Sequence, residues 1–497
     1  MDKSSVFYHF KKHYKPDQVK LLERAYQFAS LAHQGQKRKS GDDYIMHSLA
    51  VANYLGNHLH MDMDTVVAGM LHDVPEDTKT TLPEIRQNFG PQVAFMVEGI
   101  TKLGKIKLRN QRDENYIETL RKMFLSMAAD IRVVLIKLAD RRHNMKTIEF
   151  LPEEKRKRIA RETLEVYAPI ANRLGMGELT GELEDLAFPV VYPKDYEWLA
   201  GQVKERYEEM AIYVKRVRDT IIKNFHEAGI KWTDIHGRAK HLYSLYEKIL
   251  RPKYDRDITK IYDLVALRII TKNLEDCYAT LGVLHSKYRP LPGRIKDYIA
   301  FPKPNGYRSI HTTVFGPEGR VLEVQIRTAE MHYEAEYGIA AHWAYIEHGK
   351  PKWGYKIPKQ LEWVTQLRDW QKDIGGSSEE FMEALKIDFF KNRIFIFTPK
   401  GEVKDLPEGA TTLDFAFAVH TDLGLYAMGA KVNGKMGKLS DELSNGDVVE
   451  IVKGSKINVS RDWMGVARTS SARSKIKAYL NQNNQGWGFL PEFIRKK

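Results

Sequence analysis

Four residues in the first third of the chain have side chains that commonly bind metal ions together: His47, His72, Asp73 and Asp140. Mixed imidazole and carboxylate ligands suit zinc, manganese or iron, whereas an all-oxygen set would indicate magnesium or calcium. Glu76 and Asp77 follow within about one helical turn, where a carboxylate could activate a water molecule. Any one of these histidines is more simply an ordinary helix residue, and only the combined set favours a metal-dependent hydrolytic site.

A second polar set alternates with aliphatic residues along residues 321–327. Glu323, Gln325 and Arg327 are expected on one face of a strand, with the aliphatic residues towards a core. Asp263 begins another strand-like run and could join Glu323 in binding Mg2+, which proteins commonly hold with one or two carboxylates and substrate phosphates. Basic residues that could bind phosphate surround these segments: Arg238, Lys240, Lys248, Arg294, Lys296, Lys303 and Arg308. Taken singly, each of them is more simply a solvated surface charge.

The composition limits the class of protein. The chain has 497 residues, 43% hydrophobic and 29% charged, which is typical of a folded protein of about three domains. Its net charge of +13 favours polyanionic partners such as nucleotides, RNA or acidic lipid, without choosing among them. No apolar run approaches the roughly 18 residues of a membrane span, and the N-terminus lacks the apolar core of a signal peptide. Because Cys277 is the single cysteine, no intrachain disulfide can form, and we expect a cytoplasmic protein without a membrane partner.

Helices must position the first set. Hydrophobic periodicity predicts one helix after another up to about residue 195. The expected helices are 20–33, 48–59, 65–71, 82–88, 115–128, 132–145 and 152–174. One or two long charged helices over 194–226 would then bridge domains.

Strands must position the second set. Short β-branched runs at 262–271 and 321–328, near helical patterns at 239–250 and 274–287, predict an α+β block. A charged helical stretch is expected near 359–373. Three further short runs predict a small β-rich domain, at 394–397, 403–406 and 448–452.

The residues around the first set are specific enough to identify a family. The chain has KRKSG at 37–41, HDVPED at 72–77 and LADRRHNM at 138–145. This order resembles the HD hydrolase domain of the RelA/SpoT family, the long synthetase/hydrolases of the alarmone (p)ppGpp. The resemblance implies a Mn2+ ion with four ligands, which are His47, His72, Asp73 and Asp140.

The same resemblance implies the remaining hydrolase roles. Glu76 and Asp77 would position and activate the attacking water, so that pyrophosphate leaves the 3′ oxygen of the alarmone. Contacts to the substrate would come from Arg38, Lys39, Asn144 and Thr147. Two positions depart from the usual pattern, because Pro75 stands where valine is common and Arg142 where leucine is common. Neither removes a ligand, and Pro75 is expected to tilt the Glu76-Asp77 pair.

The second set resembles the synthetase, or pyrophosphokinase, domain of the same family. The matching blocks are GRAKHLYSLYEK from 237, IYDLVALRI from 261, PGRIKDYIAFPKPNGYRSIHTT from 292, EVQIRT from 323 and AEYGIAAHWAY from 335. The resemblance implies that Asp263 and Glu323 bind Mg2+, that Glu323 also activates the acceptor 3′-hydroxyl, and that Tyr307 stacks on the guanine of GDP or GTP. The implied phosphate and polar contacts are Arg238, Lys240, Lys248, Lys296, Lys303, Asn305, His311 and Gln325.

Two further features bear on regulation. RIKD at 294–297 matches the R-x-K-D form of bifunctional members, whereas synthetase-only members carry an acidic variant and a degraded HD motif. Residues from about 390 to 453 resemble a TGS domain, a ubiquitin-like module that senses tRNA on the ribosome within this family, and His420 falls in the matching loop. A packing or autoinhibitory module is the alternative. The later C-terminal regulatory domains of long members are missing, so the chain is either truncated or a naturally short member.

We therefore expect a multidomain protein. Its parts would be an all-α HD-type hydrolase domain at 1–195, a helical linker at 196–227, an α+β nucleotidyltransferase-like synthetase domain at 228–345, a helical connector at 346–388, a small β-grasp TGS domain at 389–453 and the start of a helical segment or tail at 454–497. The expected function is bifunctional stringent-response control: transfer of pyrophosphate from ATP to GDP or GTP, and Mn2+-dependent hydrolysis of (p)ppGpp. The alternatives are a hydrolase with an inactive, regulatory synthetase domain, and a regulator that binds the ribosome or uncharged tRNA.

Overall fold

The computed structural model describes residues 3–104, 126, 129–252, 254–303, 305–341 and 393–484. The chain divides into two compact units, Met1–Lys372 and Asp373–Lys497, and each is described by itself. Apart from residue 126, the helix expected at 115–128 lies outside the described residues, as does the helical stretch expected near 359–373.

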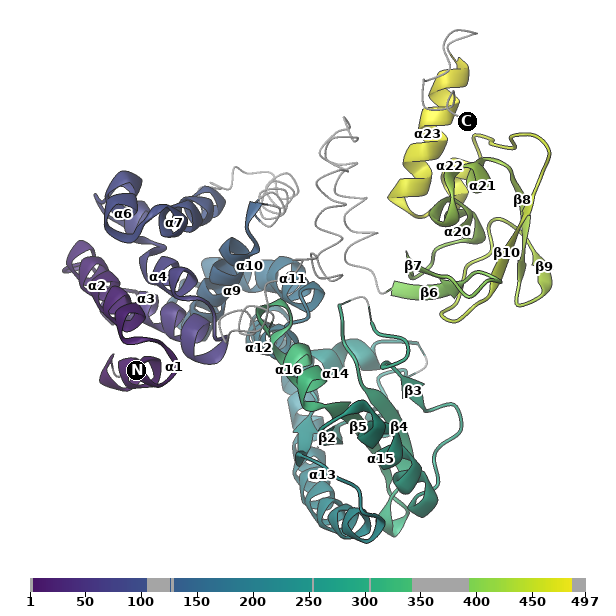
Figure 1. The fold of residues 1–497 in the computed structure, drawn as a ribbon, viewed down its shortest axis with the longest axis horizontal. Coiled ribbons are helices and arrows are strands. Elements are labelled where there is room, and N and C mark those ends of the chain that lie inside the picture. The colour runs from purple at the N-terminus through teal and green to yellow at the C-terminus, as the bar shows by residue number, and fades with distance from the viewer. Residues whose placement is uncertain are drawn as a thin grey trace. The chain divides into compact units, whose positions relative to one another are not determined.

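The first part of the first unit is built from helices (Figure 1). They are α1 (Lys3–His13), α2 (Pro16–Ala32), α3 (Ile45–Asn53), η1 (Tyr54–His58), α4 (Met63–Leu71), α5 (Val74–Asp77), α6 (Leu82–Phe89), α7 (Pro91–Gly104), α9 (Ile131–Lys146), η2 (Ile148–Phe150), α10 (Glu153–Glu162), η3 (Thr163–Tyr167), α11 (Ala168–Arg173) and α12 (Gly177–Val191). This confirms the expected all-α domain. The helix expected over 152–174 is instead divided by the π-helical turn η3, and α1 was not expected.

Two helices of this part lie almost wholly in the interior. Every residue of α4 except Asp64 is buried, and α9 is buried over most of its length. A helix that is apolar on all sides must be covered by others, and α4 packs against α2, α3, α7 and α9. Each begins at an aspartate whose carboxylate accepts a backbone N–H, from Thr65 for Asp62 and from Arg132 for Asp130. The predicted ligands carried by these helices are therefore buried too.

A five-stranded sheet forms the second part of this unit. Its order is β1-β2-β5-β4-β3, with β2 and β5 parallel and every other neighbouring pair antiparallel. The elements are α13 (Pro193–Ala228), β1 (Asp234–Ala239), α14 (Leu242–Ile249), η4 (Ile258–Lys260), β2 (Val265–Thr271), α15 (Leu274–Lys287), β3 (Lys296–Asp297), β4 (Ile310–Phe315), η5 (Pro317–Gly319), β5 (Val321–Thr328) and α16 (Ala329–Tyr337). The expected α+β block is confirmed, although the sequence patterns had indicated only β2 and β5.

One face of this sheet is the core. Leu267, Val324 and Ile326 pack there in one cluster with residues of α13 and α15. The second half of α13 supplies Tyr213 and Phe225 to the same core. The helix expected as a linker is therefore also a packed element of the sheet domain. The opposite face carries the polar residues of β5, as the alternation predicted.

The second unit is a small β domain followed by helices. It contains β6 (Arg393–Phe397), β7 (Val403–Pro407), α20 (Thr412–Val419), α21 (Thr421–Leu425), β8 (Ala427–Val432), β9 (Lys435–Gly437), β10 (Val449–Lys453), α22 (Trp463–Val466) and α23 (Ser470–Asn484). Its sheets have the orders β10-β8-β9 and β6-β7. The buried Asp414 carboxylate accepts hydrogen bonds from the backbone N–H of Thr411 and of Thr469, which fastens the segment after the strands to α20.

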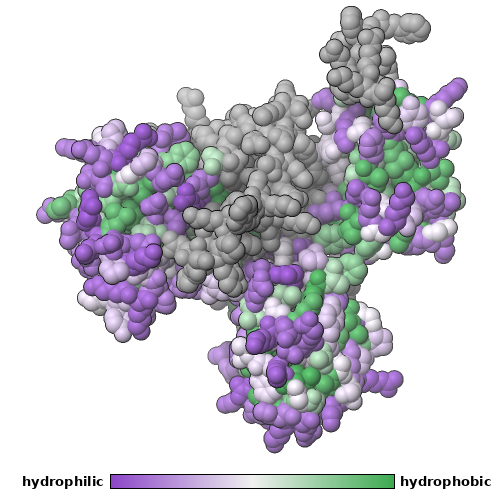
Figure 2. Space-filling model, viewed as in Figure 1, coloured by the Kyte–Doolittle hydropathy of each residue, from purple (hydrophilic) through white to green (hydrophobic). Residues whose placement is uncertain are grey.

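The described surface is rich in polar residues. On the face in Figure 2, hydrophilic residues surround smaller hydrophobic areas, as a charged fraction of 29% requires. Among the described helices, none has both the length and the apolar character needed to cross a bilayer.

The two parts of the first unit meet closely at Gly338. Its φ of +56° suits glycine, and an added Cβ would collide with the carbonyl oxygen of Leu174 and the backbone of Gly175. The N–H of Ile339 donates to that same Leu174 oxygen, at 2.9 Å. The backbone after α16 therefore lies directly against the turn between α11 and α12.

We predict that Gly338→Ala destabilises the first unit by roughly 1–3 kcal/mol, because both the backbone conformation and the close approach are lost. Thermal unfolding of the whole chain measures this. Gly282→Ala is the matched control, since Gly282 lies inside α15 with open space around it, and it should be neutral or slightly stabilising. Equal melting temperatures for the two variants would contradict the packing described here.

Candidate functional site

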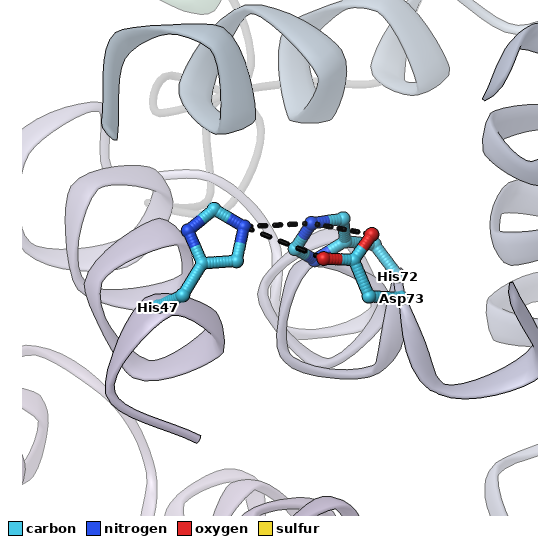
Figure 3. Close-up of side chains that lie close together, drawn as sticks. All are labelled: His47, His72 and Asp73. Carbon is cyan, nitrogen blue, oxygen red and sulfur yellow. Dashed lines mark hydrogen bonds and ion pairs between the residues drawn. The ribbon is translucent and has the colours of Figure 1, made fainter. Parts of the chain in front are cut away.

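Three of the predicted metal ligands lie together at helix ends (Figure 3). His47 is in α3, His72 follows the last residue of α4, and Asp73 precedes α5. Nε2 of His47 lies 3.3 Å from Nε2 of His72 and 3.5 Å from Oδ2 of Asp73. Nε2 of His72 lies 3.2 Å from Oδ1 of Asp73. Both histidines are buried, so their inner nitrogens face one another and the carboxylate.

Asp140, on α9, reaches the same point. Its Oδ1 lies 3.3 Å from Nε2 of His47 and 3.8 Å from Nε2 of His72. Ligand atoms bound at about 2.0–2.2 Å to one metal ion stand roughly 3–3.6 Å apart. The separations among His47, His72 and Asp73 fit a single divalent ion, and Asp140 lies within the same range of His47 but slightly farther from His72.

Hydrogen bonds orient both histidines for this task. Nδ1 of His72 lies 2.8 Å from the carbonyl oxygen of Gly69, to which it must donate, so the lone pair of Nε2 is left for a metal. Nδ1 of His47 lies 2.9 Å from Nδ1 of His143. Burial and the nearby His47 and Arg38 lower the pKa of His143 to about 3, so this ring is neutral and its Nδ1 can accept a hydrogen bond from the Nδ1–H of His47. His143 was missed, and its only signal was its place in LADRRHNM.

The charge of the site is dominated by carboxylates. Burial by itself would lower the pKa of His72, but Asp73 and Asp140 raise it to about 10. Burial would also raise the pKa of Asp140, yet Lys137 and the two histidines hold it well below its usual value. A buried site of this kind favours a cation.

The predicted water-activating pair lies in α5, beside the ligands. Partial desolvation raises the pKa of Glu76 to about 7 although the residue is exposed, with Lys137 opposing the shift and Asp73 adding to it. A carboxylate that titrates near neutral pH suits proton transfer. Oδ2 of Asp77 lies 2.7 Å from the hydroxyl of Tyr44, which is also 2.8 Å from Oδ2 of Asp73. Tyr44 was not predicted, although it stands three residues before His47.

Two of the four predicted substrate contacts of the hydrolase lie against this cluster. Nδ2 of Asn144 donates to Oδ1 of Asp140 at 2.6 Å, and a guanidinium N–H of Arg38 donates to Oδ1 of Asn144. Lys39 is exposed on the loop beside Arg38. The hydroxyl of Thr147 donates to the carbonyl oxygen of His143, 3.3 Å away, where α9 ends.

The second predicted set gathers on the polar face of the sheet. Asp263 precedes β2, and its carboxylate accepts from Nζ of Lys248 at 2.6 Å and of Lys240 at 3.0 Å. Burial would raise the pKa of Asp263, but these two lysines lower it to about 2. On β5, Oε1 of Glu323 accepts from Nε2 of Gln325 at 3.0 Å and lies 3.3 Å from Nδ1 of His311. The two carboxylates interact, since the charge of Asp263 opposes ionisation of Glu323.

The predicted base-stacking residue lies at the edge of the same face. The hydroxyl of Tyr307 is 2.8 Å from Nε2 of His311, and Nζ of Lys303 lies 5.2 Å from the centre of the tyrosine ring. Lys296, in β3, pairs in register with His311. The remaining predicted contacts are at the ends of the site: Arg238, in β1, and Asn305, whose Nδ2 donates to the backbone oxygen of Asn172 at 3.2 Å.

Two buried arginines lie on this face, and only one of them, Arg327, was predicted there. Arg327 and Arg268 are 0% and 2% exposed, and a guanidinium N–H of each donates to Oε1 of Glu336, at 2.9 and 2.8 Å. The guanidinium of Arg327 lies 5.8 Å from the centre of the Tyr307 ring. The alternation of β5 had placed Arg327 on this face. Arg268 was missed, and its signal was a single charge within the apolar run from Leu264 to Ile270.

His420 lies in the second unit. Its Nδ1 accepts the backbone N–H of Asp422 at 3.2 Å and so caps α21, while 69% of its side chain is exposed.

Comparisons with known proteins agree with three separate domains. Residues 25–177 match the HD domain, residues 237–350 match the region found in RelA/SpoT proteins, and residues 394–453 match the TGS domain. A GTP pyrophosphokinase of Streptomyces coelicolor is 47% identical, with 94% of this chain and 56% of the relative covered.

Two other relatives carry different names. A guanosine-3′,5′-bis(diphosphate) 3′-pyrophosphohydrolase of Aquifex aeolicus is 44% identical, with 95% of this chain and 66% of the relative covered. The bifunctional (p)ppGpp synthase/hydrolase SpoT of Escherichia coli is 45% identical, with 93% of this chain and 65% of the relative covered. The chain therefore spans between 56% and 66% of the length of these three relatives.

We predict that nucleotide binding at the sheet weakens above about pH 8. Desolvation by the surrounding protein, together with the charges of Lys296 and Lys240, lowers the pKa of Lys303 to about 8, although the residue as a whole is exposed. The ammonium is charged below that pKa and neutral above it, so its attraction for phosphate is lost as the pH rises. Calorimetric titration with ATP and with GDP between pH 7 and 9.5 measures this. Lys303→Arg should move the loss to higher pH, and an unchanged profile in this variant would exclude Lys303 as the cause.

Proposed function

By its HD, RelA/SpoT and TGS domains the chain belongs to the RelA/SpoT proteins, and we propose that it is a bifunctional alarmone enzyme of the stringent response. It would transfer pyrophosphate from ATP to the 3′-hydroxyl of GDP or GTP, and would hydrolyse (p)ppGpp to GDP or GTP and pyrophosphate. The observation that supports this most directly is the presence of two separate sets of functional side chains within one unit, each near-complete in its ligands and charges.

In the hydrolase we propose that His47, His72, Asp73 and Asp140 hold Mn2+, which when bound supplies charge stabilisation for the reacting phosphate. Glu76 and Asp77 take the proton of the attacking water. The water oxygen bonds to the phosphorus next to the ribose, the bond from that phosphorus to the 3′ oxygen breaks, and the 3′ oxygen takes up a proton. Arg38, Lys39, Asn144 and Thr147 orient the nucleoside; Arg38 and Asn144 already lie beside the ligands.

In the synthetase we propose that Asp263 and Glu323 hold Mg2+, which when bound supplies charge neutralisation for the ATP phosphates. Glu323 accepts the proton of the acceptor 3′-hydroxyl, whose oxygen bonds to the β-phosphorus of ATP as AMP leaves. Tyr307 stacks on guanine. The proposed phosphate and polar contacts are Arg238, Lys240, Lys248, Lys296, Lys303, Asn305, His311 and Gln325. With this many cations placed beforehand, positioning and electrostatics account for most of the catalysis.

We also propose that the TGS domain contacts tRNA on the ribosome. His420 supports this, because its imidazole caps a short helix and yet remains largely exposed. A role confined to tRNA or ribosome binding is less well supported, because it assigns no function to the His/Asp cluster or to the polar face of the sheet in the first unit. Cytoplasmic location is part of the same proposal.

Two opposing reactions in one chain would waste ATP if both ran together, so their rates need to be coordinated. Helix α12 connects the two sites physically. Glu182, on α12, accepts from Arg142, the neighbour of His143 in α9. One turn further, the Asp185 carboxylate lies 2.8 Å from Nδ1 of His241 and accepts the N–H of Tyr243. His241 is adjacent to Lys240, which binds Asp263. We propose that a shift of α12 alters both sites together. In this proposal Arg142, where the family commonly has leucine, links α9 to α12 through Glu182.

The two activities should be separable by point mutation. Asp73→Asn removes a metal ligand and should abolish hydrolysis while synthesis persists, and Glu323→Gln should do the reverse. Both reactions are followed by anion-exchange chromatography of the nucleotides. If either substitution silenced both activities in a folded protein, the two sites would not be independent.

The coupling should be visible in a variant far from the metal ligands. Asp185→Ala is expected to change the hydrolysis rate by roughly fivefold or more, a typical size for coupling between sites, as well as changing synthesis. Asp219→Ala is the matched control, because Asp219 is exposed on α13 and pairs with the neighbouring Arg218. Hydrolysis that is the same in both variants would argue against coupling through α12.

A further inference from the structure

Lys137 is a charged residue in a place where charge is costly. It lies in α9 within the run from Val133 to Ala139, whose other members are all buried. Its side chain is only 17% exposed, and an ammonium group that leaves water needs a partner. Nζ of Lys137 lies 2.7 Å from Oδ2 of Asp140, one helical turn further along. Neither the family motifs nor the proposed mechanism assigns a function to Lys137.

The groups that face Lys137 place it on the reacting side of the site. Its charge acts on Asp140, Asp73 and the Tyr167 hydroxyl, and it is the strongest cationic influence on Glu76. Arg38 reaches the cluster separately, through Asn144. Lys137 therefore faces the metal ligands and the water-activating carboxylate, whereas Arg38 and Asn144 form the nucleoside-binding side.

A charge balance shows why this position matters. The two charges of a divalent cation would balance Asp73 and Asp140, and Lys137 would then share its partner with the metal. The next anion to arrive beside these ligands is the 3′-diphosphate of the substrate. A buried ammonium within reach of that diphosphate can stabilise the charge that develops on it.

We propose that Lys137 is a further catalytic residue of the hydrolase: it releases Asp140 when a divalent cation binds and donates hydrogen bonds to the non-bridging oxygens of the 3′-diphosphate. The proposal rests on the hydrolase function proposed above. The bonds made and broken stay as described there. Lys137 keeps its protons throughout, so it adds only charge stabilisation and positions the pyrophosphate product.

The competing explanation is that Lys137 only fixes the orientation of Asp140. The two roles predict opposite effects on metal affinity. A lysine that merely orients a ligand strengthens metal binding, so its loss weakens it. A lysine that binds the substrate phosphate repels the metal ion slightly, so its substitution leaves the metal affinity unchanged or increases it.

The experiment compares the wild type with Lys137→Met, Lys137→Arg and the control Lys157→Met. Lys157 lies in α10 and pairs with Glu153 on the surface of the same domain. Mn2+ affinity is measured by electron paramagnetic resonance titration of the apoprotein, and inorganic pyrophosphate is titrated calorimetrically into the Mn2+-loaded protein. We expect Lys137→Met to bind Mn2+ at least as tightly as the wild type, to bind pyrophosphate at least tenfold more weakly and to lose at least a hundredfold in hydrolysis kcat. Lys137→Arg should recover part of the pyrophosphate affinity, and Lys157→Met should resemble the wild type.

Three results would overturn the proposal: weaker Mn2+ binding in Lys137→Met with kcat restored by excess Mn2+, unchanged pyrophosphate affinity, or a Lys137→Arg variant that folds and binds pyrophosphate as poorly as Lys137→Met. Retained synthesis shows that each variant is folded. Failure of the underlying function is distinct, because the wild type itself would then not hydrolyse ppGpp.

Discussion

Helix α12 packs against elements of both candidate sites. This one helix contacts α9, which carries Asp140, and also α14 and α16, which flank the polar face of the sheet. Its carboxylates are divided between the two directions, with Glu182 towards Arg142 and Asp185 towards His241. The glycines at 175 and 338 let the backbones on either side approach without side chains between them. In the proposed function, a movement of α12 would reach both sites, so the two opposing reactions would share this helix.

Both sites solve the same electrostatic problem. Each gathers carboxylates in a region of low exposure, where an uncompensated negative charge is expensive. Around Asp140 the compensation comes from Lys137 and the two histidines, and around Asp263 it comes from Lys240 and Lys248. Cations that hold the carboxylates in place are then already positioned for phosphates when a metal ion binds. The proposed substrates are polyanions, so the side chains that balance the protein's own carboxylates would also suit them.

The sequence predicts most of the polar side chains that lie at a fixed spacing within a motif or a strand. It predicts fewer of those whose position depends on packing between distant segments. HDVPED and the alternation of 321–327 indicated the ligands and the polar strand face, since a motif and a period of two are local properties. Tyr44, His143 and Arg268 were missed, because the residue that each one contacts is distant in the chain. The contact of His143 is with His47, a histidine that could have had other partners. The strands β1, β3 and β4 were missed for a related reason: β3 has two residues, and the polar residues Arg238 and His311 interrupt the apolar pattern of β1 and β4.

The central claim is that one chain carries both activities at two sites. It is tested most directly by incubating the protein with ATP and GDP in Mg2+ without Mn2+, then adding Mn2+ to the same reaction, with nucleotides resolved by anion-exchange chromatography. We expect a ppGpp peak in the first stage and its consumption in the second. If no ppGpp forms, while the folded protein consumes added ppGpp once Mn2+ is present, the chain is a hydrolase alone and the claim is wrong.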